Sequence, residues 1–268
     1  MTNIIVTGGS GFLGSHLVNH LAKNKKNKIL ALDNNFRGLA KNLQNTKNIK
    51  FKKVDIRKKD KIKNLFKKTD VVVHLAFING TNFFYDKPDL VIDVGLKGTL
   101  NLIELSNKFN VKKFIFASSS EVYQKPSKIP TNEAEVCKIP DVKNPRYSYG
   151  ASKLIGEIAT LHMLKKKIKK IIFRPHNLYG IRMGFNHIVP EIISKIYRNS
   201  SKLKKKYANI TMQGSGKETR SFCYIDDAVN QIERIINKGK DKEIYNVGTM
   251  EEIKILNVVK LIGKYLNV

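Results

Sequence analysis

The feature that most constrains this chain is a glycine-rich turn between a short apolar strand and a helical pattern. The strand covers residues 4–6, and apolar side chains recur at helical spacing from Leu13 onward. Between them stand Gly8, Gly11 and Gly14. The first glycine permits a tight turn, the second lets backbone approach a pyrophosphate, and the third lets the helix pack on the strand. Because a helix N-terminus offers free N–H groups to phosphates, the turn predicts a dinucleotide site.

Apolar strands alternate with helical patterns beyond this turn. The stretch "KILALD" predicts a second strand that ends at Asp33, and "NIKFKKVDIR" predicts a third that ends at Asp55 and Ile56. The stretch "DVVVHLA" predicts a fourth strand that ends at Leu75 and Ala76. This alternation is typical of a parallel, doubly wound sheet. The sequence therefore predicts an α/β, Rossmann-like fold.

Asp33 indicates which dinucleotide the site takes. It lies about twenty residues beyond the turn, where a carboxylate accepts hydrogen bonds from ribose hydroxyls. A carboxylate there also repels a 2′-phosphate, which favours NAD over NADP. A turn or cap residue is the alternative interpretation of Asp33.

Tyr149 and Lys153 are candidate catalytic residues. They are four residues apart, so a helix places both side chains on one face. A nearby ammonium stabilises a phenolate and lowers the pKa of a tyrosine, and the same lysine can hold a ribose. This spacing also arises by chance on lysine-rich helices, but the upstream turn favours the catalytic interpretation. Tyr147 is the rival, although no lysine follows it at the same spacing.

The formal net charge of +28 raises the question of a polyanionic partner. Of the 50 basic residues 42 are lysine, and most are scattered among Asn and Ile. This scatter is typical of solvated surface lysines, so nucleic-acid binding is the minority interpretation.

Other features exclude several classes of protein. The two cysteines lie far apart and the six histidines show no ligand spacing, so we expect neither a disulfide framework nor a metal site. No apolar stretch is long enough to span a membrane, and the first residues lack the basic region of a signal peptide. These features predict a cytoplasmic protein.

The stretch "TGGSGFLG" resembles the signature of the extended short-chain dehydrogenase/reductases, the NAD-dependent sugar-nucleotide epimerases and dehydratases. The resemblance extends over nearly the whole chain, and Tyr149 with Lys153 matches the family's catalytic pair. It implies NAD contacts from the turn, from the ends of three further strands, from the catalytic pair and from a proline beside the nicotinamide. The predicted cofactor-binding residues are Gly8, Gly11, Phe12, Leu13, Gly14, Asp33, Asp55, Ile56, Leu75, Ala76, Tyr149, Lys153 and Pro175.

The resemblance also assigns roles within "SSSEVYQ", residues 118–124. It implies that Ser119 shares the reacting proton with Tyr149, whereas Ser118 is expected to cap the next turn. Dehydratases of the family carry Asp-Glu where this chain has Ser120 and Glu121. A serine is a poor acid for expelling water, which weakens the dehydratase interpretation. Ser-Glu also resembles the UDP-glucuronate decarboxylases, so Glu121 is either catalytic or a carboxylate that orients the site.

Residues 1–174 are expected to form the NAD-binding domain, and residues 175–268 mainly a substrate lobe with segments that return to the sheet. The resemblance implies a diphosphate contact for Arg220, whose guanidinium suits two oxygens at once. The predicted substrate-binding residues are Ser120, Asn177, His187, Gln213 and Arg220.

Three features depart from the family pattern. Gly95 stands where the family usually has an asparagine before "V-x-G-T", and Gln124 stands where it has the glycine of "VYG". The sequence ends at Val268, earlier than family members usually end, which suggests a smaller lobe or a truncated chain.

The sequence therefore predicts an NAD-dependent sugar-nucleotide epimerase that acts through transient oxidation at C4. The alternatives are a 4,6-dehydratase or decarboxylase that uses Glu121, a ketone reductase with exchanging cofactor, and a non-catalytic protein that binds RNA through its lysines. The expected partner is a nucleotide-diphosphate sugar. The resemblance implies a homodimer formed through residues 97–109 and 150–165, in which Leu96, Leu100, Ile103 and Leu105 are candidate contacts unless they pack in the core.

Overall fold

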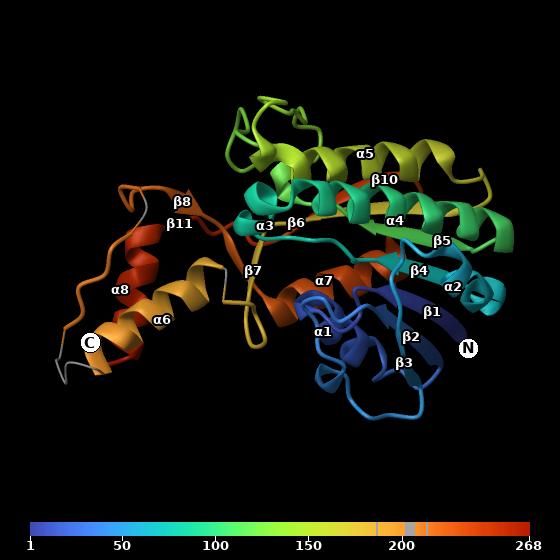
Figure 1. The fold of residues 1–268 in the computed structure, drawn as a ribbon, viewed down its shortest axis with the longest axis horizontal. Helices are drawn as coiled ribbons and strands as arrows, with labels where there is room; N and C mark the ends of the chain where they lie inside the picture. The colour runs from blue at the N-terminus through green and yellow to red at the C-terminus, as the bar shows by residue number, and fades with distance from the viewer. Residues whose placement is uncertain (186, 202–206, 213) are drawn as a thin grey trace. The chain divides into compact units, whose positions relative to one another are not determined.

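The computed structural model describes residues 1–185, 187–201, 207–212 and 214–268. Within this part of the chain one large sheet has the strand order β10-β6-β5-β4-β1-β2-β3 (Figure 1). All of its pairings are parallel, which confirms the predicted α/β, doubly wound fold. The strands are β1 (Thr2–Thr7), β2 (Asn27–Asp33), β3 (Ile49–Lys53), β4 (Val71–His74), β5 (Lys113–Ala117), β6 (Lys169–Pro175) and β10 (Glu243–Val247).

The central strands are apolar because helices cover both of their faces. All four residues of β4 are buried, and so are the last four of both β1 and β5. Figure 1 shows α4 (Pro88–Phe109) and α5 (Ser148–Met163) on one face of the sheet, with α1 (Phe12–Leu21) and α7 (Ile225–Lys238) on the other.

The sheet has one point at which the strand order reverses. The chain runs outward from β1 to β2 and β3, then crosses to the other side of β1 and continues with β4. In doubly wound sheets, ligands bind at the carboxyl ends of the strands beside such a reversal. The glycine-rich turn follows β1 and Leu75 follows β4, so both lie at this place.

The chain divides into two compact units. The first comprises Met1–Pro175 and Asp226–Val247 and contains the large sheet, and the second comprises His176–Ile225 and Gly248–Val268. In the second unit Ile192, Ile196 and Val258 form a small core. Its elements are β7 (Asn177–Tyr179), α6 (Ile188–Ser201), β8 (Thr219–Arg220), β9 (Phe222–Tyr224), β11 (Ile253–Lys254) and α8 (Ile255–Tyr265).

Short elements complete the first unit. They are η1 (Ala40–Asn42), α2 (Lys59–Lys63), η2 (Asn64–Lys68), α3 (Thr81–Asp86), η3 (Ser120–Val122) and η4 (Pro145–Tyr147).

Two strands end earlier than the sequence predicted. β3 ends at Lys53 because the carboxylate of Asp55 accepts a hydrogen bond from the backbone N–H of Arg57 at 2.9 Å and forms a turn. β4 ends at His74, so Leu75 lies just beyond the strand.

Candidate active site

The glycine-rich turn has the geometry that a bound pyrophosphate requires. Gly8 has φ +68°, and a Cβ there would lie 2.9 Å from the Cα of Ala76. A Cβ on Gly14 would overlap the carbonyl oxygen of Gly8. α1 begins at Phe12 after Gly11, and no side chain caps its first N–H groups. The residues therefore fit a dinucleotide: the turn leaves space for backbone to approach it, and the helix N-terminus offers donors.

Asp33 lies at the carboxyl end of β2, next to this turn. Its carboxylate accepts hydrogen bonds from the backbone N–H of Ser10 at 3.1 Å and of Asn35 at 2.8 Å. Each carboxylate oxygen can accept a further bond, so the side chain is held in place and can still receive ribose hydroxyls.

Asp55 and Ile56 have other partners within the first unit. The carboxylate of Asp55 is paired with the guanidinium of Arg57 at 2.6 Å, and that pairing lowers the pKa of Asp55. Ile56 is buried, and its side chain fills the space beside Gly98 in α4. The carboxylate of Asp55 is therefore already engaged by a cation in this structure.

Leu75 and Ala76 are hydrogen-bonded to Thr7, the last residue of β1 before the glycine-rich turn. Leu75 N–H donates to the carbonyl oxygen of Thr7, and Ala76 N–H donates to its hydroxyl, both at 3.2 Å. They lie with Gly8 and Asp33 at the carboxyl edge of the sheet, while Phe12 and Leu13 open α1 from the same turn.

Tyr149, in the first turn of α5, is buried. Its ring stacks on Phe84 at 5.2 Å between centroids and meets Phe77 edge-on at 5.9 Å. Burial raises the pKa of Tyr149, a hydrogen bond with Ser119 lowers it, and the charge of Glu121 raises it further. The predicted lowering of this pKa by the Lys153 ammonium is therefore wrong for this structure, because burial outweighs the favourable contacts.

Lys153 is held from two directions. Its Nζ donates to the carbonyl oxygen of Ala117 at 2.6 Å and lies 3.4 Å from the centroid of the Phe77 ring. Burial lowers the pKa of Lys153 well below the usual lysine range. Its Nζ lies 5.5 Å from the centroid of the Tyr149 ring, so the helix places the pair on one side, as the spacing predicted.

Phe77 was missed by sequence reasoning, and it explains one departure from the family pattern. A Cβ on Gly95 would lie 2.7 Å from Cε1 of Phe77 and 3.0 Å from Cβ of Ser152. The phenylalanine ring therefore occupies the space that a side chain at position 95 would need. The signal was the aromatic residue directly after "VVVHLA".

The "SSSEVYQ" stretch leads into η3. Ser119 Oγ accepts from the backbone N–H of Glu121 at 3.2 Å, so Ser119 caps the turn, and its hydroxyl also lowers the pKa of Tyr149. Ser118 Oγ is buried without a hydrogen-bond partner among the described residues. The expectation that Ser118 is the capping hydroxyl is therefore wrong, because the cap belongs to Ser119. Ser120 is the first residue of η3.

Glu121 is paired with Arg146, which sequence reasoning also missed. Nη2 of Arg146 lies 3.0 Å from Oε1 and 2.9 Å from Oε2 of the glutamate. The guanidinium carbon lies 5.1 Å from the centroid of the Phe84 ring. Arg146 stands three residues before Tyr149 in "NPRYSYGASK", and this proximity was the available signal.

Gln124 takes the left-handed conformation that usually favours glycine. Its φ is +55°, and its Nε2 donates to the carbonyl oxygen of Glu121 at 2.5 Å. The side chain therefore braces the same turn that presents Ser119 and Glu121.

The remaining predicted residues lie at the end of the large sheet or in the second unit. Pro175 is the last residue of β6, opposite Val247. In the second unit, Asn177 Nδ2 donates to the carbonyl oxygen of Ser221, and His187 immediately precedes α6. Arg220 is exposed in β8. Gln213 lies outside the described residues.

Two features are absent from the described residues. No helix there is long and apolar enough to cross a membrane. No group of three or more His, Cys, Asp or Glu side chains in that part of the chain is placed to hold a metal ion.

Comparisons with known proteins show which family the chain resembles. Residues 4–248 match the model of the NAD dependent epimerase/dehydratase family. The chain is 34% identical to a dTDP-D-glucose 4,6-dehydratase of Dictyostelium discoideum, over 97% of the chain and 61% of that protein. It is 32% identical to a putative UDP-glucose 4-epimerase of Methanocaldococcus jannaschii, over 97% of the chain and 81% of that protein.

A solved structure gives the same fold. The UDP-glucose 4-epimerase of Thermotoga maritima, determined with UDP-glucose, superimposes with a TM-score of 0.85 at 28% identity. The alignment covers 98% of this chain and 82% of that one. These relatives are named for two different reactions, so the choice between the reactions has to come from the site residues.

Proposed function

Since the chain belongs to the NAD-dependent epimerase/dehydratase family, we propose that it is a sugar-nucleotide epimerase acting through transient oxidation at C4. Family membership makes the chain an enzyme with NAD as its cofactor, which disfavours the non-catalytic RNA-binding interpretation.

The observation that carries the choice of reaction is the pairing of Glu121 with Arg146. Both oxygens of the glutamate lie within 3.0 Å of one guanidinium nitrogen. A carboxylate that removes a proton from carbon needs a free oxygen directed at that proton. Ser120 stands beside it where a dehydratase of this family has its acid. The arrangement supports an orienting role for Glu121 and an epimerase rather than a dehydratase.

The proton chemistry belongs to Tyr149 and Ser119. We assign the Tyr149 oxygen as the group that takes the C4 hydroxyl proton and later returns it, with Ser119 sharing the bond to the sugar oxygen. When bound, NAD would supply the acceptor for the C4 hydride and the source of the hydride that returns to the opposite face of the sugar. Lys153, fixed by Ala117 and Phe77, is placed to hold the cofactor's ribose.

The substrate we propose is a nucleoside-diphosphate sugar, as in the structural relative that holds UDP-glucose. In the second unit Arg220 is proposed to bind the diphosphate, because its exposed guanidinium can hold two phosphate oxygens. Asn177, His187 and Gln213 are proposed as further substrate contacts.

The test is to incubate the purified protein with UDP-, GDP- and dTDP-sugars and to identify the products by NMR. We expect a C4 epimer of one sugar and no net change in NAD redox state. A stable 4-keto-6-deoxy sugar, released CO2 or free NADH would replace the epimerase with the dehydratase, the decarboxylase or the ketone reductase, respectively.

The dehydratase or decarboxylase that uses Glu121 remains the second candidate, because Glu121 is present and a 34% identical relative is a dehydratase. Replacing Glu121 by Gln distinguishes the two roles. If the glutamate is the base, turnover falls by about 10²- to 10⁴-fold. If it only orients the turn, as we propose, the loss stays below about tenfold. Glu104→Gln, which breaks the surface pair with Lys59, is the matched control.

We also propose that the protein is cytoplasmic and that it forms a homodimer through α4 and α5. Ile92, Ile155 and Ile158 are exposed on these helices, and a groove of about 570 Å³ on α4 includes Ile92, Leu96 and Leu100. Ile103 and Leu105 are buried in the core, so they do not belong to this surface. Sedimentation of the wild type and of Ile155→Glu tests the proposal, which requires the variant to be monomeric.

A further inference from the structure

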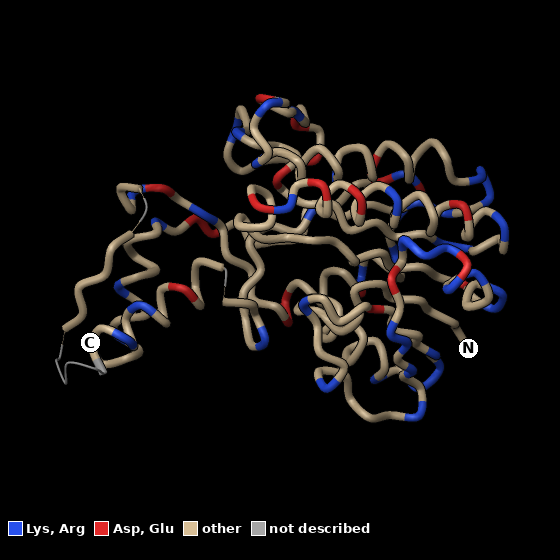
Figure 2. The backbone as a smooth tube through the Cα atoms, viewed as in Figure 1, with Lys and Arg blue, Asp and Glu red and all other residues tan. Residues whose placement is uncertain are grey.

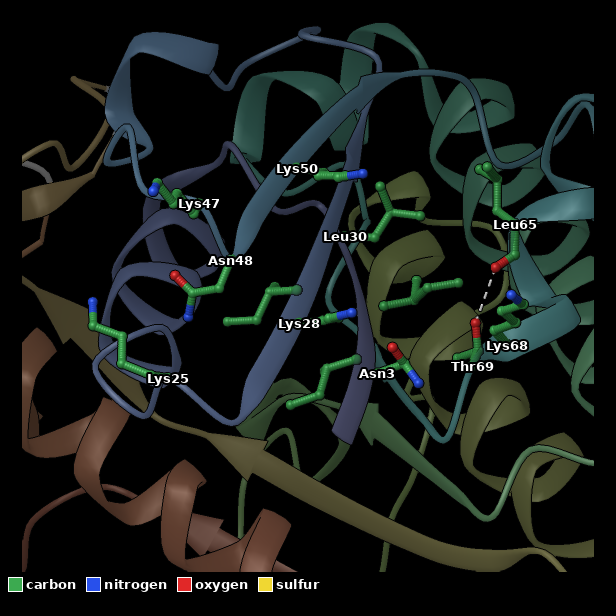
Figure 3. A pocket seen from close by; sticks show the side chains of 13 residues that line it. Asn3, Lys25, Lys28, Leu30, Lys47, Asn48, Lys50, Leu65, Lys68 and Thr69 are labelled. Atoms are coloured by element: carbon green, nitrogen blue, oxygen red, sulfur yellow. Dashed lines mark hydrogen bonds between the residues drawn. The ribbon is translucent and has the colours of Figure 1, made fainter. Parts of the chain in front are cut away.

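A cavity lies at the other edge of the large sheet from the candidate active site. It has a volume of about 660 Å³ and is formed by the amino ends of β1, β2 and β3 together with η2 (Figure 3). We call it the amino-edge cavity. Its lining residues are Asn3, Ile4, Ile5, Lys25, Lys28, Ile29, Leu30, Lys47, Asn48, Lys50, Leu65, Lys68 and Thr69.

The amino-edge cavity is separate from the glycine-rich turn. Lys28 lies near the start of β2 and Asp33 at its end. At about 3.3 Å per residue, the five steps between them span about 16 Å. No predicted cofactor or substrate residue lines this cavity.

The lining of the amino-edge cavity is basic. Five of the lining residues are lysines and none is acidic. Among the described residues none of these lysines forms an ion pair, whereas Lys59, Lys112 and Lys195 each pair with a carboxylate elsewhere. Figure 2 shows blue segments gathered where β2 and β3 lie.

The acidic group nearest in sequence to the lining does not compensate this charge. Asp70 follows Thr69, and its Oδ2 accepts from the backbone N–H and the side-chain amide of Asn3. Its Oδ1 is paired with Lys112 at 2.8 Å. Asp70 therefore pairs with none of the cavity lysines, whose like charges repel one another.

The floor of the cavity is apolar. The strand register places Lys28 and Leu30 on one face of β2, with Lys50 of β3 opposite Leu30. Leu30 and Leu65 are partly buried and pack against the core. Figure 3 shows the side chains of Lys28 and Lys50 extending in the same direction on either side of Leu30.

Exposure to solvent is the simplest explanation for most lysines of this chain. It does not explain why five lysines and no acidic residue line one cavity. Nucleic acid is a poor occupant, because single strands bind to surfaces that carry aromatic rings as stacking platforms. The lining contains no aromatic residue. Its volume lies within the usual range of small-molecule sites.

We propose that the amino-edge cavity binds a small ligand that carries a chain of linked phosphates, either free or attached to a nucleoside. Ammonium groups bind phosphates as point charges, and their arrangement around one concavity suits several phosphates on one ligand. The nucleoside of an attached ligand would lie on the leucine floor.

The experiment is calorimetric titration of the full chain with sodium tripolyphosphate and with ATP at about 0.15 M NaCl, where exposed charges are screened. The test variant is Lys28→Gln with Lys50→Gln. The control, Lys260→Gln with Lys264→Gln, removes the same charge from exposed positions of α8. We expect the test variant to weaken binding by about tenfold or more and the control by less than about twofold.

Amide NMR shifts locate the binding independently of the variants. Both ligands should shift the amides of Lys28, Asn48 and Thr69 rather than those of Gly11 and Gly14. Equal affinity for the two ligands indicates that the phosphates alone are recognised, and tighter ATP binding indicates that the nucleoside contributes. Both results support the site.

Three results would overturn the proposal: no binding of either ligand up to about 5 mM, equal weakening in both variants, or shifts confined to the glycine-rich turn. The proposal does not depend on the epimerase assignment. Turnover of the test variant on the sugar-nucleotide panel is expected to equal that of the wild type, so failure of one proposal is distinguishable from failure of the other.

Discussion

Two aromatic rings hold the side chains of the proposed catalytic pair. Phe77 lies under the Lys153 ammonium at 3.4 Å, and Phe84 stacks on Tyr149 at 5.2 Å. Rings of this kind exclude water, so burial outweighs the favourable polar contacts of Tyr149 and raises its pKa. The phenol is therefore protonated in the structure near neutral pH.

Tyr149→Phe tests the assigned proton carrier. The substitution removes only the hydroxyl and keeps the ring against Phe84, so we expect a normal fold and retained NAD binding. Turnover should fall by about 10²- to 10⁴-fold, the usual contribution of a positioned acid–base group. The control is Tyr147→Phe, which alters the half-buried tyrosine two residues earlier. Unchanged turnover of Tyr149→Phe, measured on the sugar found in the product panel, would contradict the mechanism.

Because the pKa of Tyr149 is raised, only a small fraction of it is phenolate at neutral pH. If the phenolate is the base for the first step, kcat/KM rises as pH increases toward that pKa. A profile that is flat on the alkaline side would show that another group takes the proton.

Gly95→Ala tests whether Phe77 excludes a side chain at position 95. Alanine favours helices, but its Cβ would lie 2.7 Å from Cε1 of Phe77. We expect a loss of about 1–3 kcal/mol of unfolding free energy from overpacking, measured by urea unfolding. In the Phe77→Leu background the loss should shrink, because the ring is gone. An equal loss in both backgrounds would mean that another contact is responsible.

At the scale of elements, His74 links two strands and a helix. Its Nδ1 lies 2.8 Å from the hydroxyl of Thr7 in β1, and its Nε2 lies 2.9 Å from the hydroxyl of Thr99 in α4. The imidazole is fully buried, and burial with the charge of Lys153 lowers its pKa well below the ordinary value of 6.5. The link between β1, β4 and α4 therefore depends on a neutral histidine.

This link predicts the direction of one pH dependence. Below pH 6.5 the unfolded chain protonates His74 while the folded protein does not, so stability from this group is lost as pH falls. The loss approaches about 1.4 kcal/mol per pH unit once the unfolded histidine is ionised. Urea unfolding at pH values from about 7.5 to about 5.5 measures this loss of unfolding free energy.

Two histidine variants test whether His74 causes the loss of stability at low pH. His74→Gln should be less stable near neutral pH but lose less on acidification than the wild type. His162→Gln, at an exposed position of α5, should follow the wild type. Identical acid slopes for all three proteins would exclude His74 as the source.

Two kinds of contact hold α5 close to the sheet. Gly156 has no Cβ, and one there would overlap the ring of Phe116 in β5. One residue on, Glu157 pairs with Arg174 of β6 at 2.6 Å, and both side chains are 4% exposed. These contacts fix the helix that carries Tyr149 and Lys153.

At the scale of the whole molecule, the net charge of +28 is the dominant feature. Like charges repel in the compact state, and salt screens that repulsion. We expect the midpoint of thermal unfolding to rise by about 2–4 °C, equivalent to about 1 kcal/mol, between about 0.02 M and about 0.3 M NaCl. Choline chloride at the same concentrations should raise the midpoint equally, because screening depends on ionic strength. A midpoint that falls or does not change would show that repulsion is not limiting.

Local signals in the sequence were sufficient for the architecture. Glycines at positions 8, 11 and 14, placed after an apolar strand, predict the turn, and alternating patterns predict the parallel sheet. The four-residue spacing predicted that Tyr149 and Lys153 lie on one side of a helix, since helical geometry depends only on separation along the chain. The resemblance to a known family supplied the expected roles.

Contacts between distant residues were decided by the tertiary structure alone. The sequence could not show that Arg146 engages Glu121, that Phe77 fills the space beside Gly95, or that burial governs the pKa of Tyr149. It also could not show that lysines at the amino ends of β2 and β3 and a lysine of η2 line one cavity. The sequence by itself determined the fold and the shared helix face of Tyr149 and Lys153, the predicted catalytic pair, because periodicity and spacing are local. The charge, pairing and burial of each group depend on packing, which only the folded chain establishes.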